Sequence, residues 1–69
     1  MPVSLAEPGV EYEITRLGGN AEVKQHLADL GFHVGGKVIV VSSTGEGLII
    51  NAKGARVAVG RDLANKIFI

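Results

Sequence analysis

The sequence predicts a mainly β fold with one short helix, arranged as a small β-barrel. Ten Gly residues divide the 69-residue chain into short apolar stretches, which is typical of strands joined by tight turns. A single segment repeats its apolar residues with helical spacing. Closing such strands into a barrel removes exposed sheet edges. Because the chain is this short, we expect residues 1–69 to form one domain.

The first strand is expected at residues 11–16. A Pro-Gly turn at residues 8–9 precedes it, and polar and apolar residues alternate along it. A Gly-Gly pair at residues 18–19 ends it. The chain has one Tyr, two Phe and no Trp, so we expect Tyr12 and Phe32 to pack in the core.

The segment after this strand predicts a helix with defined ends. Asn20 is expected to cap the N-terminus, because its side-chain oxygen can accept an amide hydrogen bond from the first turn. Apolar residues at i, i+4 and i+7 form one stripe between Val23 and Leu30. Gly31 should end the helix with a positive φ, and Phe32 should fold back on Leu27 in a Schellman motif.

The second half of the sequence predicts four more strands and one helical turn. These elements are expected at residues 37–43 (strand), 44–47 (turn), 48–51 (strand), 53–54 (turn), 56–59 (strand), 61–66 (helical turn) and 67–69 (strand). The strand at 37–43 contains four consecutive β-branched aliphatic residues, which indicates a central strand buried on both faces. In the strand at 56–59, Arg56 and Ala58 should face away from the two Val residues.

Composition argues against several functional classes. Seven Lys and Arg balance seven Asp and Glu, so the chain lacks the excess positive charge that nucleic acids or anionic membranes attract. It has no Cys, which excludes disulfides and thiolate metal sites. Its longest apolar run, residues 38–41, is far shorter than the about 20 residues of a membrane-spanning helix. No signal peptide is recognisable at the start, so we expect a cytoplasmic protein.

Motifs for catalysis and for cofactor binding are missing. Gly35-Gly36-Lys37 lacks the spacing of a phosphate-binding loop and runs into a strand, so GTP binding is not expected. Nothing marks a Ser beside a His as an activated nucleophile. We therefore predict that the protein is not an enzyme and needs no cofactor.

Four side chains on and after the helix form a weak candidate metal site. Glu22, His26 and Asp29 fall on one polar flank of the helix, and His33 lies just past its end. Carboxylate and imidazole donors can hold Fe(II). The spacing matches no strong metal-binding signature and is common on exposed helices, so we predict a solvated surface and no metal site.

The chain resembles the FeoA family, the small cytoplasmic components of bacterial ferrous iron transport systems. The resemblance covers nearly the whole chain and is strongest at residues 54–60. It rests on Leu5, Pro8-Gly9, Leu27, Leu30-Gly31-Phe32, Gly35, Val38, Val40, Gly54-Ala55-Arg56-Val57-Ala58-Val59-Gly60, Ala64 and Ile67. The order and spacing of these residues are specific as a set. Two features depart from the family pattern: the turn at 44–47 is short and lacks a proline, and the helix carries only Lys24, Gln25 and His26 where relatives are often Arg-rich.

The resemblance implies an SH3-like β-barrel with the helix inserted after the first strand. It also implies a partner, FeoB, the membrane iron transporter with a cytoplasmic GTP-binding domain, at which this chain would act on the inner face of the membrane. FeoA-like domains also occur in iron-dependent repressors, and the start at Met1 looks like the stand-alone form. An SH3-like or oligonucleotide-fold nucleic-acid binder remains as an alternative of another class, although few aromatic residues are present to stack on bases.

Candidate partner-binding residues lie on the strands and on the helix. A barrel takes in only alternate residues from each strand, so some of the apolar residues at 38–41 and 48–50 must point outward, and Ile49 is the candidate for an exposed patch. Arg56 could pair with a partner carboxylate. Lys24 and His26 are the helical candidates. Self-association through the same patch remains open.

Overall fold

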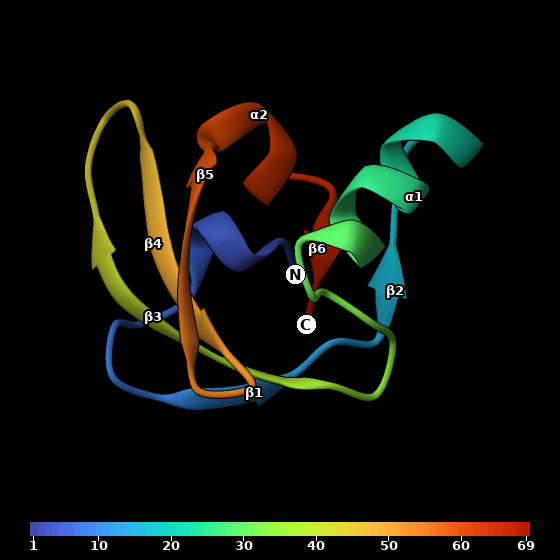
Figure 1. Cartoon of the computed structure of the whole chain (residues 1–69). Helices are drawn as coiled ribbons and strands as arrows, with labels where there is room; N and C mark the ends of the chain where they lie inside the picture. The colour runs from blue at the N-terminus through green and yellow to red at the C-terminus, as the bar shows by residue number, and fades with distance from the viewer.

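Two antiparallel sheets surround one core in the computed structural model, which describes residues 1–69 (Figure 1). The larger sheet has the order β1-β3-β4-β5, and the smaller pairs β2 with β6. The strands are β1 (Glu11–Glu13), β2 (Arg16–Leu17), β3 (Lys37–Ser43), β4 (Gly47–Ala52), β5 (Ala55–Gly60) and β6 (Ile67–Phe68). The helices are the 3-10 turn η1 (Val3–Leu5), α1 (Ala21–Asp29) and α2 (Arg61–Ala64). The mainly β fold with one principal helix is confirmed.

The strand expected at residues 11–16 is two strands that belong to different sheets. The Ile14 amide donates to the Gly36 carbonyl at 2.9 Å, whereas the next amide, of Thr15, donates to the Phe68 carbonyl at 2.8 Å. The chain therefore passes from the larger to the smaller sheet between these two residues. Ile14 is 1% exposed at this corner. The polar pair Thr15-Arg16 interrupts the alternation here, but such an interruption does not show that the two sides of it join different sheets.

The helix follows the sequence signals closely. The Asn20 Oδ1 accepts a hydrogen bond from the Val23 amide at 2.9 Å. At the other end Gly31 has a φ of 101°. The Gly31 amide donates to the Ala28 carbonyl at 3.0 Å, and the Phe32 amide donates to the Leu27 carbonyl at 2.9 Å. These two bonds are those of a Schellman motif, so both predicted helix ends are confirmed.

Replacing Gly31 with Ala is expected to lower the free energy of unfolding by about 1 kcal/mol, because an L side chain disfavours the left-handed conformation. A Cβ at Gly31 would meet no atom within 4 Å, so the cost is conformational and not steric. Chemical denaturation measures it. Gly45→Ala is the control, since Gly45 also has open space around it but no positive φ. Equal stability of the two variants would contradict this explanation.

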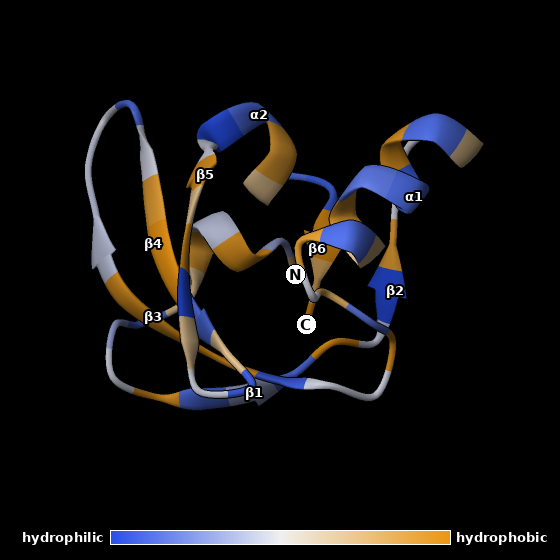
Figure 2. Cartoon of the chain, viewed as in Figure 1, coloured by the Kyte–Doolittle hydropathy of each residue, from blue (hydrophilic) through white to orange (hydrophobic).

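The core is aliphatic apart from Phe32 and lies between the inner face of the larger sheet and the helices. It contains thirteen buried residues: Val3, Ala6, Ile14, Leu27, Phe32, Val38, Val40, Leu48, Ile50, Ala52, Val59, Ala64 and Ile67. Figure 2 shows hydrophobic residues on β4, β6 and the middle of β3, whereas most of α1 is hydrophilic. Phe32 packs in this core, and Tyr12 packs against it half-buried, as expected.

The prediction that β3 is buried on both faces is wrong. Val38 and Val40 are buried, but Val41 is 40% exposed. Register between β3 and β4 shifts here, since Val40 faces Ile50 while Ser42 faces Ile49, which makes Val41 an extra residue in a β-bulge. The helices cover only the inner face of the sheet, so the outward-pointing β-branched residues remain in contact with solvent.

Strand closure is incomplete. β1 and β5 are the outer strands of the larger sheet and remain as edges, contrary to the expectation that a barrel would leave none. The helical turn at the C-terminal end forms as α2, shorter than the predicted 61–66. The η1 turn was not predicted, because three residues are too few to show a period. Its Val3 is fully buried.

Candidate functional site

The outer face of the larger sheet carries an apolar patch. We call Ile39, Val41, Ile49 and Ala58 the outer-face patch. Strand register places Ile49 opposite Ala58, while the inward-pointing Ile50 faces Val57. Val41 and Ile49 are 40% and 39% exposed, which is high for large apolar side chains in a sheet. Ile49, the candidate for an exposed patch, therefore points outward from the sheet.

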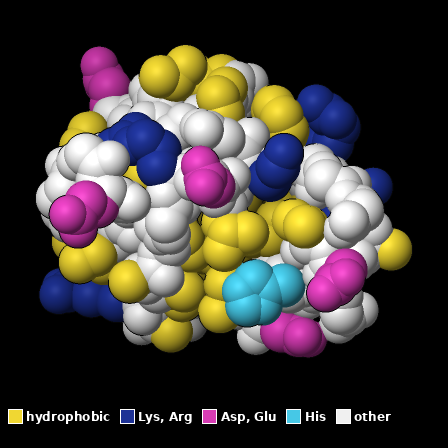
Figure 3. All heavy atoms as spheres, turned by 90° about the horizontal axis from the view of Figure 1, so that it is seen from above, with side chains coloured by type: hydrophobic (Ala, Val, Ile, Leu, Met, Phe, Trp, Pro, Cys, Tyr) yellow, Lys and Arg dark blue, Asp and Glu magenta, His cyan; other side chains and the backbone are white.

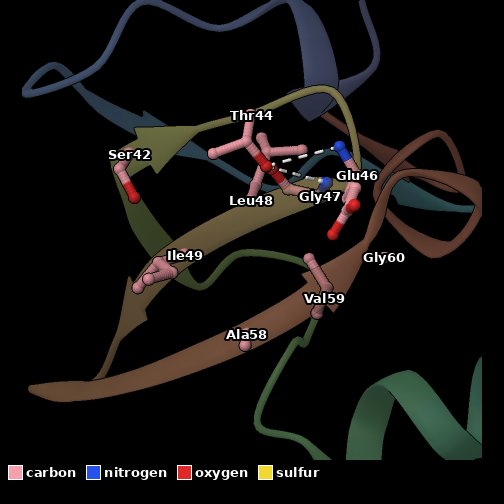
Figure 4. A pocket seen from close by; sticks show the side chains of 9 residues that line it. All are labelled: Ser42, Thr44, Glu46, Gly47, Leu48, Ile49, Ala58, Val59 and Gly60. Atoms are coloured by element: carbon pink, nitrogen blue, oxygen red, sulfur yellow. Dashed lines mark hydrogen bonds between the residues drawn. The ribbon is translucent and has the colours of Figure 1, made fainter.

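A hollow of about 330 Å³ lies at one end of this patch (Figure 4). Ile49 and Ala58 belong to both the patch and the hollow. The lining residues come from the β3–β4 hairpin and from β5: Ser42, Thr44, Glu46, Gly47, Leu48, Ile49, Ala58, Val59 and Gly60. Its floor is apolar and its rim, at the hairpin, is polar. Such a hollow suits an apolar side chain on its floor, with the backbone of that residue near the polar rim.

Thr44 shapes the hairpin at the rim of the hollow. Its Oγ1 accepts hydrogen bonds from the Glu46 and Gly47 amides, each at 3.3 Å (Figure 4). Its amide donates to the Gly47 carbonyl at 2.8 Å. The short turn at 44–47 therefore closes without a proline, because a side-chain hydroxyl satisfies the turn amides instead.

Arg61 joins α2 to the same hairpin. Its Nη2 donates to the Ser43 Oγ at 3.2 Å and to the Thr44 carbonyl, and its Nε donates to the Gly45 carbonyl at 3.4 Å. One guanidinium thus holds three consecutive residues of the hairpin, as its planar set of donors permits. Sequence reasoning missed this role, because an Arg in a helical turn gives no signal of a contact with residues 16 to 18 positions earlier.

The weak metal candidates do not assemble. Glu22, His26, Asp29 and His33 are all exposed. No group of three His, Asp or Glu side chains lies close enough to hold a metal ion. The Asp29 carboxylate accepts a hydrogen bond from the Gln25 Nε2 at 2.9 Å. Figure 3 shows His and acidic side chains near one another at the α1 end of the molecule. Absence of Fe(II) binding stays a prediction.

The candidate partner-binding residues divide between two sides of the molecule. Arg56 is exposed on the outer face of the sheet, opposite Asn51 and on the same face as Ile49. Lys24 and His26 are exposed on α1, which packs on the other side of the core (Figure 1). The structure therefore brings Ile49 and Arg56 onto one surface and leaves the helical pair apart. No helix has the length and apolar character needed to cross a membrane.

Comparison with known proteins supports the resemblance. The chain is 31% identical over 68 residues to a candidate Fe(2+) transport protein A of Methanocaldococcus jannaschii, covering 99% of this chain and 83% of that protein. The crystal structure of an iron uptake regulatory protein, FeoA, superposes with a TM-score of 0.91 at 29% identity, covering 97% of this chain and 91% of that one.

Two more distant structures share the fold alone. FeoA of Stenotrophomonas maltophilia complexed with zinc, described as an SH3 domain protein, has a TM-score of 0.82 at 22% identity, with coverage of 97% and 86%. A manganese-dependent transcriptional repressor has a TM-score of 0.88 at 14% identity, and the match covers 97% of this chain but 39% of the repressor. The SH3-like architecture is thereby confirmed. The FeoA domain model matches residues 1–69, the whole sequence, and the chain belongs to the FeoA family.

Proposed function

We propose that this chain is an accessory protein of ferrous iron uptake and that it acts by binding the cytoplasmic part of an FeoB-like GTP-binding transporter. It works as a single domain in the cytoplasm, at the inner face of the membrane when bound, and has no catalytic role of its own. Family membership and the name of the M. jannaschii relative support the link to Fe(2+) transport. The observation that carries the binding surface is the outer-face patch beside the hollow.

The physical basis for this surface is exposed apolar area that folding leaves uncovered. Val41 and Ile49 remain 40% and 39% exposed on neighbouring strands of the sheet. Contiguous exposed apolar surface on a small protein usually marks an interaction site. The hollow next to Ile49 provides a place for a buried anchor residue of the partner, and such central anchors carry most of the binding energy at interfaces.

Arg56 adds a charged contact at the edge of the patch. It makes no ion pair and no side-chain hydrogen bond, since the structure's one ion pair joins Lys37 to Glu13 at 3.1 Å. A free guanidinium suits bidentate pairing with a carboxylate. We therefore expect an acidic residue of the transporter opposite Arg56 and an apolar one at the hollow. Lys24 and His26, on the far side of the core, contribute to a second contact only if the partner wraps around the domain.

Replacing Ile49 with Lys is expected to weaken binding to the purified cytoplasmic domain of the FeoB-like transporter by at least about tenfold, since a charge would be buried in an apolar interface. Val34→Lys is the matched control. Val34 is a β-branched residue that is 63% exposed in the loop after α1, away from the patch. Isothermal calorimetry compares the affinities, and circular dichroism verifies folding. A folded Ile49→Lys chain with unchanged affinity would overturn the proposed surface.

The alternative functions lead to different results in the same assay. A nucleic-acid binder would retain DNA or RNA with an affinity that falls as salt is raised. The balanced charge of the chain disfavours that outcome. A domain of an iron-dependent repressor would bind the rest of that repressor in place of the transporter. The structural match with the manganese-dependent repressor supports this alternative only in that the two share a fold.

A further inference from the structure

β5 is an edge strand whose outward backbone groups can be identified. The turn that leads into it has positive φ at both central residues, Lys53 at 55° and Gly54 at 79°, which defines a type I′ turn. In such a turn the flanking residues, Ala52 and Ala55, form the hydrogen-bonded pair. Because an antiparallel ladder alternates, every second residue of β5 then turns its peptide groups away from β4. These residues are Arg56, Ala58 and Gly60.

The outward backbone groups at the middle of this edge have no partner. None of the hydrogen bonds of turns, loops or side chains involves Arg56 or Ala58. Both residues are exposed, as is Gly60. An edge strand of six residues with free amides and carbonyls is a template for pairing with another strand.

The two edges of the larger sheet differ in their protection. β1 has three residues, and both of its ends are exposed Glu side chains, so pairing β1 with a second β1 would oppose like charges. β5 contains no Pro, no bulge and no inward-pointing charge, which are the usual devices that block edge pairing. Its one charged side chain, Arg56, lies near one end. Pairing is thus disfavoured at β1 and open at β5.

We propose that β5 pairs antiparallel with β5 of a second copy of this chain. Charge complementarity points to this occupant. The start of the strand is basic, with exposed Lys53 and Arg56, and its end lies beside exposed Glu46 and Asp62. Arg61 also lies at this end, but its guanidinium is engaged by the Ser43 hydroxyl and the Thr44 and Gly45 carbonyls of the hairpin, which leaves the two carboxylates for the second copy. The Arg61 amide donates to the Glu46 carbonyl at 3.3 Å, which places this hairpin at the end of β5. An antiparallel second copy brings the basic end of each strand to the acidic end of the other.

Ladder geometry restricts the register of this pairing. Residues whose peptide groups point away from β4 must face residues of the same kind in the second copy. Even-numbered residues of β5 therefore face even-numbered residues, and odd-numbered residues face odd-numbered ones. If the two Arg56 residues faced each other at the centre of the pairing, their guanidinium groups would be directly opposed. If the two Val57 residues faced each other there, the guanidinium groups would be diagonal neighbours across the ladder. Centring it on Ala58 places each Arg56 opposite Gly60, which has no side chain. Ala58 then faces Ala58 across the two-fold axis.

This pairing has a consequence for the outer face. A two-fold axis through Ala58, perpendicular to the sheet, keeps the outer faces of both copies on the same side. The Ile49 side chains flank the two central Ala58 residues, since Ile49 and Ala58 are register partners. The two outer-face patches become one continuous apolar surface on an eight-stranded sheet, because each copy contributes a four-stranded sheet. The dimer does not depend on the transporter for its formation.

The absence of Cys makes the register directly testable. Opposed residues of a hydrogen-bonded antiparallel pair have Cα atoms about 5.5 Å apart, within the range of disulfides. Purified Ala58→Cys chains should form disulfide-linked dimers under mild oxidation about tenfold or more faster than Glu11→Cys chains, since pairing raises the effective thiol concentration. Glu11→Cys is the control because Glu11 is an exposed residue on the other edge of the same sheet. Equal rates overturn the proposal.

A second variant tests the backbone contact itself. Ala58→Pro removes an amide that points away from β4, so the β4–β5 ladder keeps its own bonds, as edge prolines allow. Sedimentation equilibrium of the unmodified chain should show a concentration-dependent monomer–dimer equilibrium, and Ala58→Pro should remain a monomer with an unchanged circular dichroism spectrum. A monomeric unmodified chain at all concentrations overturns the proposal, as does a dimer that persists in folded Ala58→Pro. A dimer that Ile49→Lys abolishes while Ala58→Cys fails to cross-link assigns the contact to the outer-face patch instead.

Discussion

Replacing Phe32 with Ala is expected to unfold most of the protein at ambient temperature. Phe32 is fully buried and is the largest of the completely buried side chains. Phe-to-Ala changes in cores cost about 3–5 kcal/mol, through lost apolar burial and the cavity left behind. A core of this size provides a net stability of only about 3–5 kcal/mol, and no disulfide is present to add to it. The loss is therefore comparable to the whole stability.

Thermal denaturation followed by circular dichroism measures this effect. The control is Leu5→Ala, since Leu5 is 68% exposed and its truncation should change the free energy of unfolding by less than about 0.5 kcal/mol. A Phe32→Ala chain that keeps a cooperative transition within a few degrees of the unmodified protein would contradict the assignment of Phe32 to the centre of the core.

Replacing Gly47 with Ala is expected to lower the free energy of unfolding by about 3 kcal/mol, at the upper end of what overpacking costs. A Cβ at Gly47 would lie 2.4 Å from the Val59 carbonyl oxygen and 3.2 Å from the Gly60 Cα. Both contacts are with backbone, so no side-chain rotation can relieve them. β4 and β5 would have to separate at this end, which is the end that forms the hollow.

Gly60→Ala is the matched control for this substitution. Gly60 is the register partner of Gly47, yet a Cβ there would meet no atom within 4 Å and its φ is not positive. Urea denaturation of the two variants separates a steric cost specific to Gly47 from a general intolerance of side chains at this position of the hairpin. Similar losses for both variants would argue against the close approach of β4 and β5. Binding of the transporter domain should weaken in Gly47→Ala and persist in Gly60→Ala.

Local signals were sufficient to predict the helix and its ends. Asn20, Gly31 and Phe32 act on atoms within a few residues of themselves, so the hydrogen bonds at both ends follow from sequence spacing. The β4–β5 hairpin is similar, because the Lys53-Gly54 turn specifies which residues face each other across it. Elements of this kind depend on short-range geometry, which a single sequence contains.

Features that join distant parts of the chain required the tertiary structure. The corner between Ile14 and Thr15 exists because amides of adjacent residues find partners at Gly36 and Phe68, far along the sequence. Burial of β3 on one face, and not two, depends on how many elements are available to cover it. No residue pattern reports either fact, since alternation and apolar runs describe one strand at a time.

The candidate site also combines features that the sequence determines with features that only the tertiary structure determines. Sequence by itself determined that some strand residues near Ile49 must point outward and that Arg56 lies on the face opposite Val57 and Val59, because side chains alternate along any strand. Only the tertiary structure decided that Ile49 and Arg56 share one surface, that Arg61 holds the hairpin beside it and that β5 remains an open edge. These facts arise from contacts between segments whose separation in sequence carries no signal, and packing and strand pairing alone determine them.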